Sequence, residues 1–148
     1  MHRSSVCAAA AMMLACLHVA SSPACAAGPG VPMLYDLVVE TGMPHLEENL
    51  RYAVTRERRC VDPRDLGRMF PVLDHVALQD CRLVPASQAD DHATYTLACS
   101  GGHGTTGEAR WQFDEHALAG TLDVRFGGKN MTFYQRISGR MLGRCEAP

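Results

Sequence analysis

The 148-residue sequence lacks most of the patterns that mark catalytic or cofactor sites. It contains no Gly-x-Ser-x-Gly element to expose a serine nucleophile and no Gly-x-x-x-x-Gly-Lys element to hold a nucleotide phosphate. After the first 26 residues the histidines form neither His-x-His nor His-x-x-x-His, and no two cysteines stand two residues apart, so zinc is not indicated. We therefore expect a protein that is not an enzyme and that needs no cofactor.

An excess of charge of one sign is also absent, since 14 basic residues face 16 acidic ones. A domain that binds nucleic acid is usually strongly basic, so this balance argues against nucleic acid as a partner. The sequence contains no internal repeat and no low-complexity tract. It is long enough for one compact domain and too short for two.

The one long apolar run lies at the N-terminus. Arg3 precedes the mostly apolar Val6–Ala20, which is shorter than a membrane span, and Ala24-Cys25-Ala26 fits the small-x-small rule for cleavage. We expect a secretory signal peptide at residues 1–26. A single β-rich domain, periplasmic or secreted, would then occupy residues 27–148 without a membrane span.

Seven cysteines are present, and three of them lie in the predicted signal peptide: Cys7, Cys16 and Cys25. Lipid attachment at Cys16 or Cys25 is the alternative to simple cleavage, because both follow small residues. The other four are Cys60, Cys81, Cys99 and Cys145. An even number in a small exported domain predicts two disulfides, for which three pairings are possible. Our hypothesis pairs Cys60 with Cys81, as a local staple, and Cys99 with Cys145, as a tether for the tail.

Apolar and polar residues alternate three times between Thr105 and Ser138, and turn-forming residues separate the three runs. This pattern predicts a meander of antiparallel strands at Thr105–Phe113, Leu118–Phe126 and Met131–Ile137. Trp111 should lie in the core, together with residues that share its face by alternation: Ala109, Phe113, Leu122, Val124, Phe133 and Ile137. Gly107 and Gly120 stand inside strands, where glycine often marks a bend or bulge, so we expect a curled sheet.

The preceding part of the chain supplies shorter strands and one helix. Alternation predicts strands at Leu34–Thr41 and Leu50–Thr55, and a hairpin made of Gln79–Val84 and Thr94–Ser100. Asp62 and Pro63 are suited to begin a helix over Pro63–Phe70, which Pro71 would end. The expected fold is mainly β, a curled antiparallel sheet or half-barrel with one short helix and two disulfides.

Several segments of the sequence resemble a bacterial exported family, called domain of unknown function 3617. The resemblance rests on the following segments: Cys60-Val61-Asp62-Pro63, Cys81, Cys99, Gly104-Thr105-Thr106-Gly107-Glu108, Tyr35-Asp36, Gly42-Met43-Pro44 and Ser138–Cys145. The sequence departs from the family at Tyr35, where tryptophan is usual, and in its dense arginines before Cys60. Because the family has no established activity, the resemblance implies only the fold and an exported location.

Few residues are candidates for binding. Arg56 and Arg59 belong to a cluster between Arg51 and Arg59 that is typical of a solvated sheet edge, and an acidic partner is the alternative interpretation. Trp111 and Tyr35 are candidate contacts for a ligand or partner. Met43 and His45 could hold copper, since thioether and imidazole ligands suit that metal, but a Met-rich packing edge is the simpler interpretation.

Three classes of function remain open. The leading hypothesis is a non-enzymatic domain that binds a small apolar ligand or an envelope protein. The second is an inhibitor of a secreted hydrolase, which would present a loop at His92 or Gly101–Gly104. The third is a periplasmic copper-binding protein that uses Met43 and His45.

Overall fold

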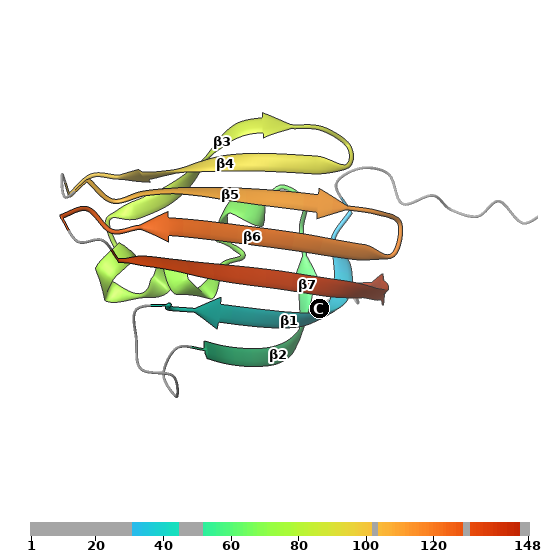
Figure 1. Cartoon of the computed structure of the whole chain (residues 1–148). Helices are drawn as coiled ribbons and strands as arrows, with labels where there is room; N and C mark the ends of the chain where they lie inside the picture. The colour runs from blue at the N-terminus through green and yellow to red at the C-terminus, as the bar shows by residue number, and fades with distance from the viewer. Residues whose placement is uncertain (1–30, 45–51, 102–103, 129–130, 146–148) are drawn as a thin grey trace, which may run out of the picture.

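The computed structural model describes residues 31–44, 52–101, 104–128 and 131–145, which form one open antiparallel sheet (Figure 1). Its strands are β1 (Met33–Gly42), β2 (Tyr52–Val61), β3 (Cys81–Gln88), β4 (His92–Cys99), β5 (Thr106–Phe113), β6 (Ala117–Arg125) and β7 (Thr132–Arg144). The order across the sheet is β2-β1-β7-β6-β5-β4-β3. The predicted meander is therefore confirmed as β5-β6-β7, while β1 reaches its place by pairing with β7, far along the chain.

The core lies on one face of the sheet, here called the inner face. Alternate residues of the meander point to it, as the pattern predicted, and Trp111, Leu122, Val124, Phe133 and Ile137 are all buried. The connection between β2 and β3 lies behind the sheet in Figure 1 and supplies the cover. Phe70 from this connection packs on Trp111 with ring centroids 5.0 Å apart. Among the described residues, one short segment of chain therefore covers the inner face.

That connection forms three short 3₁₀ turns: η1 (Leu66–Arg68), η2 (Pro71–Asp74) and η3 (Val76–Leu78). The predicted helix over Pro63–Phe70 is therefore wrong. Asp62 does accept a hydrogen bond from the backbone N–H of Arg64 at 2.9 Å, but only a turn follows. Phe70 precedes a proline and is extended, with φ −85° and ψ 108°, because the proline ring disfavours the helical region for the residue before it.

Gln135 is a buried polar residue that joins the cover to the sheet. Its Oε1 accepts a hydrogen bond from the backbone N–H of Val72 at 3.2 Å, and its Nε2 donates to Thr41 Oγ1 at 2.8 Å. A buried amide must find such partners, because leaving its polar groups unpaired costs free energy. The pair of bonds fixes η2 against β1 and β7.

Gly107 and Gly120 do not mark bulges, since the β5–β6 pairing runs through both without a shift of register. Gly120 is needed for space. A Cβ atom there would lie 2.5 Å from Cζ3 of Trp111, which stands opposite Gly120 on the neighbouring strand. The glycine therefore accommodates the indole ring of the core instead of bending the strand.

Two disulfides are present, as expected, but the hypothesis for their pairing is wrong. Cys81 bonds to Cys99, and Cys60 bonds to Cys145. Cys81 and Cys99 stand directly opposite each other in the β3–β4 hairpin, which brings the two Cα atoms to 4.0 Å. Cys60 pairs with Leu34, whose other neighbour is Gly143 of β7, so Cys145 reaches Cys60 across the start of β1.

Replacing Trp111 tests the packing of the cover on the sheet. We expect Trp111→Ala to lower the free energy of unfolding by about 3–5 kcal/mol, as for other buried aromatic residues. Trp111→Phe should cost less, because the indole Nε1 is buried without a hydrogen-bond partner among the described residues. Chemical denaturation measures both changes. Gln112→Ala, on the exposed neighbour, is the control and should change the value by no more than about 0.5 kcal/mol.

Removing each disulfide should have a different effect. The chain-entropy model gives about 4.5 kcal/mol for the Cys60–Cys145 bond, which spans 85 residues, and about 3 kcal/mol for Cys81–Cys99, which spans 18. Double Cys→Ser variants of each pair, compared by chemical denaturation, should rank in that order. Peptide mapping without reduction checks the pairing itself, and a Cys60–Cys81 peptide from the native protein would contradict the structure.

Candidate functional site

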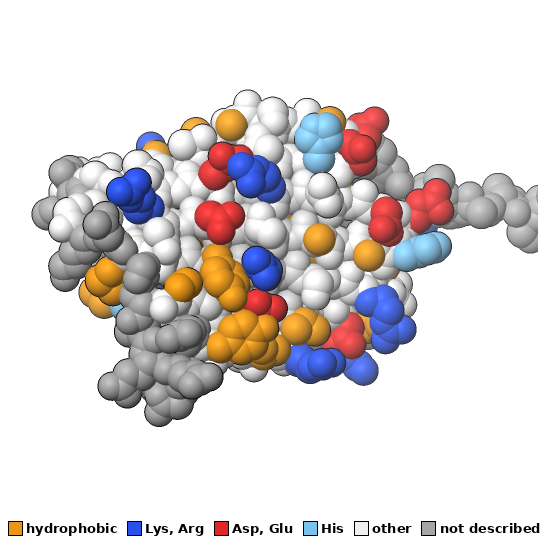
Figure 2. All heavy atoms as spheres, in the orientation of Figure 1, with side chains coloured by type: hydrophobic (Ala, Val, Ile, Leu, Met, Phe, Trp, Pro, Cys, Tyr) orange, Lys and Arg blue, Asp and Glu red, His pale blue; other side chains and the backbone are white. Residues whose placement is uncertain are grey.

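The face of the sheet away from the core, here called the outer face, is free of any covering segment among the described residues. Figure 2 views this face and shows acidic and basic side chains scattered over a largely uncharged polar surface. Apolar and aromatic side chains gather on it over the β1 and β2 side of the sheet. The outer face and the β2 edge are therefore the surfaces that remain for binding.

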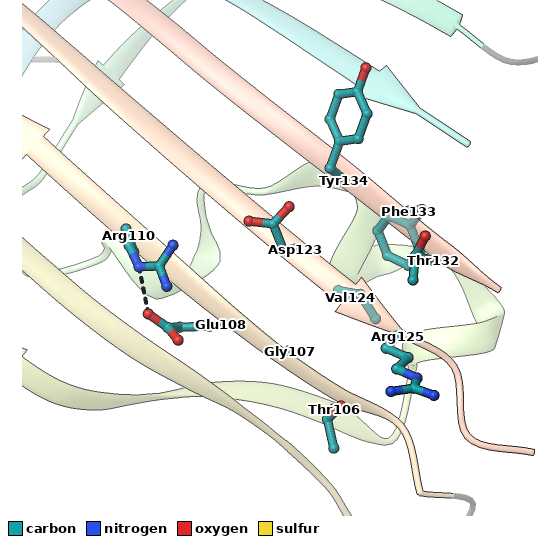
Figure 3. Close-up of a pocket in the computed structure, with 10 residues that line it drawn as sticks. All are labelled: Thr106, Gly107, Glu108, Arg110, Asp123, Val124, Arg125, Thr132, Phe133 and Tyr134. Atoms are coloured by element: carbon teal, nitrogen blue, oxygen red, sulfur yellow. Dashed lines mark ion pairs between the residues drawn. The ribbon is translucent and has the colours of Figure 1, made fainter. Parts of the chain in front are cut away.

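A shallow hollow of about 570 Å³ lies on the outer face over β5, β6 and β7 (Figure 3). Its lining includes two carboxylates, two guanidinium groups, a threonine and a tyrosine: Glu108, Asp123, Arg110, Arg125, Thr106 and Tyr134. Arg110 Nε pairs with Glu108 Oε1 at 2.6 Å. Because charges of both signs alternate in an open hollow, it suits the mixed polar surface of a protein better than an apolar molecule.

Beside the hollow, Glu40 joins three strands. It accepts a hydrogen bond from the Tyr134 hydroxyl at 3.4 Å and pairs with an Arg136 guanidinium nitrogen at 3.6 Å. The Arg136 guanidinium also lies 4.6 Å from the centroid of the Tyr134 ring. The pKa of Tyr52 on β2 is raised, chiefly by its hydrogen bond to Glu40. Glu40 therefore interacts with residues of both neighbouring strands.

The β2 edge is the second candidate surface. All ten residues of β2 pair with β1 in an unbroken register, and no described strand pairs with its other side. Every β2 side chain except Val61 is exposed, including Tyr52 at 53% and Val54 at 48%. Arg56, Arg58 and Arg59 lie within the same strand, because β2 continues to Val61 and does not end at Thr55 as predicted.

The other sequence candidates are placed less favourably for contact. Tyr35 and Trp111 point to the inner face and are 8% and 1% exposed, so they offer little surface to a partner. Met43 is half-buried and packs against the core, and His45 lies outside the described residues. Within the described part of the chain, no three His, Cys, Asp or Glu residues are grouped to hold a metal. Copper binding at Met43 and His45 stays a prediction.

The glycine-rich segment before β5 was expected to be a loop. The letters from Gly102 to Gly107 match Gly-x-Gly-x-x-Gly, which in dinucleotide-binding proteins lies between a strand and a helix. Here the segment joins β4 to β5, two strands of one antiparallel sheet, so no helix N-terminus follows to hold a phosphate. The sequence therefore matches the motif, but the structure around it is not that of a dinucleotide-binding site.

Comparison with protein-family models, curated proteins and solved structures gives no match. The resemblance to the exported family therefore stays a prediction based on cysteines, glycines and strand alternation. Among the described residues, no helix is long and apolar enough to cross a membrane.

The link between Glu40 and Tyr52 can be tested by titration. We expect Glu40→Ala to lower the pKa of Tyr52 toward the ordinary value of 10.0, because its hydrogen bond and the negative charge beside it are both lost. NMR titration of the tyrosine ring signals measures the shift. Asp36→Ala, on the same face of β1, is the control and should leave Tyr52 unchanged; an unchanged Tyr52 in Glu40→Ala would contradict the contact.

Proposed function

We infer that the protein is an exported, non-enzymatic binding domain whose partner is another protein of the same compartment. The observation that carries this proposal is the β2 edge, where ten consecutive residues have no partner on one side among the described strands. An open edge offers backbone N–H and C=O groups to a second chain. The mixed charges of the neighbouring hollow also suit a protein surface.

A small apolar ligand is less well supported than a protein. The inner face is filled by large side chains, among which Trp111 and Phe70 are in ring contact and almost fully buried. The hollow on the outer face is open and lined by charged groups. A site for a small molecule is usually deep and enclosed, with few polar groups, whereas this hollow is shallow, open and lined by four charged side chains.

Several features support export and the absence of catalysis. Two disulfides are compatible with an oxidising compartment, and the predicted signal peptide would deliver the chain there. The four cysteines in the disulfides cannot act as thiolates. His92 bonds to Asp91 at 2.6 Å, but both side chains are exposed on a turn and are not set in a cleft.

Capture and reconstitution test the function. The oxidised protein, purified from the envelope fraction, is incubated with envelope extract and cross-linked, and the bound proteins and small molecules are identified by mass spectrometry. We expect one exported protein that, once purified, binds saturably at one to one by calorimetry. Recovery of a small molecule alone, or catalytic turnover that is abolished by His92→Ala with the fold intact, would contradict the proposal.

A further inference from the structure

We propose that the β2 edge takes up an extended segment as an eighth, antiparallel strand, and that this segment is acidic in its N-terminal half and apolar in its C-terminal half. The inference rests on the proposed function and specifies the partner's chemistry. It combines three properties of β2, namely an accessible backbone, a row of cations and a pair of exposed apolar side chains.

The backbone of β2 is suited to pairing, whereas the backbone of the opposite edge is not. β2 contains neither proline nor glycine and shows no shift of register against β1 over ten residues. In an antiparallel sheet, alternate residues direct their N–H and C=O groups to the two sides of a strand. About half of the β2 peptide groups thus point away from β1. On β3, Pro85 removes a donor and the register shifts between Pro85 and Ser87.

The charge of β2 selects the partner. The strand has three cations, Arg56, Arg58 and Arg59, and one carboxylate, Glu57. The closest nitrogen–oxygen distance between Arg59 and Glu57 is 3.9 Å. Arg58 is opposite Asp36, yet no ion pair within 4.0 Å involves Arg56 or Arg58 among the described residues. A local positive charge on a chain of net charge −2 attracts an acidic segment.

For an antiparallel partner, like every other pairing in the sheet, the order of residue types along it follows from the order of side chains on β2. By alternation, Tyr52, Val54, Arg56 and Arg58 share the outer face, so this row runs from apolar to basic. An antiparallel partner would set acidic side chains opposite Arg58 and Arg56, and then apolar side chains opposite Val54 and Tyr52.

A second copy of this chain fits the edge less well than an acidic segment. Two antiparallel β2 strands would set arginine opposite arginine in most registers that overlap the three residues. Like charges directly opposite each other on neighbouring strands are destabilising. The same arginines that discourage self-pairing therefore favour a partner of opposite charge.

A synthetic peptide of about ten residues tests the inference. In the probe, glutamate alternates with threonine in the N-terminal half, and valine alternates with threonine in the C-terminal half. Fluorescence anisotropy should show saturable binding to the full protein that weakens as salt is raised. A peptide with lysine in place of glutamate, and one with a central proline, should each bind at least tenfold more weakly.

Matched variants locate the site. Arg56→Glu with Arg58→Glu should weaken probe binding at least tenfold. The control is Arg68→Glu with Arg82→Glu, which makes the same charge change at exposed positions on η1 and on β3, the opposite edge of the sheet, and should leave binding within about twofold. Circular dichroism of all variants confirms that the fold is intact. Equal weakening in both pairs would show a general charge effect and overturn the inference.

Amide hydrogen exchange separates strand addition from simple charge attraction. In the complex, alternate amides of β2 should exchange at least tenfold more slowly, because those that point outward become hydrogen-bonded. Binding without this protection, or dimerisation through β2 in place of peptide binding, would overturn the inference. If an exported partner is captured but binds the Arg56→Glu, Arg58→Glu variant normally, the inference fails and the proposed function stands. If no partner is captured and the probe does not bind, both fail.

Discussion

The structure depends on covering one apolar face with very little chain. The seven strands direct most of their large apolar side chains to the inner face, and a single sheet cannot bury that face by itself. The connection from Val61 to Asp80 provides the second layer. Phe70 packs on Trp111, and Gln135 accepts a hydrogen bond from the Val72 N–H, so a few contacts hold this layer in place.

The small size of this covering layer determines which surfaces stay accessible. The cover buries the central strands but not β2, whose inner-facing residues Thr55, Glu57 and Arg59 are exposed although they lie beside the buried Val39, Leu37 and Tyr35 of β1. β2 is therefore exposed on both faces, and its stability comes from pairing with β1 and from the Cys60–Cys145 bond. A strand fixed in this way can keep its outer edge available for a partner.

Local patterns were sufficient to predict the meander and the place of Trp111, because alternation with a period of two reports directly which side chains face the core. Long-range pairings left no such signal. Nothing in the sequence of β1 shows that it lies between β2 and β7, so the Cys60–Cys145 bond was not predictable, although the arginines between Arg51 and Arg59 did indicate a sheet edge.

The Cys81–Cys99 bond was within reach, since a hairpin with its turn near Asp90 places these residues opposite each other. The hydrogen-bond partners of Gln135 could not be predicted, because the sequence pattern does not distinguish a buried glutamine in a strand from an exposed one. The helix failed because Asp62 and Pro63 specify only a start. The conformation after this start is set by the burial of Leu66, Met69 and Phe70 against the sheet and by Pro71, which keeps Phe70 extended.

The separation of Cys60 and Cys145 has a consequence for the biogenesis of the protein. A chain emerges from its N-terminus first, so Cys60 and Cys81 are the earliest two thiols of the described domain to become available to an oxidant. They are not partners in the native structure, and the native partner of Cys60, Cys145, emerges 85 residues after it. Oxidation of Cys60 before Cys145 has emerged joins it to a non-native partner, and thiol–disulfide exchange is then required to reach the native pairing. The yield of this protein in a cell should therefore depend on a disulfide isomerase as well as on an oxidase.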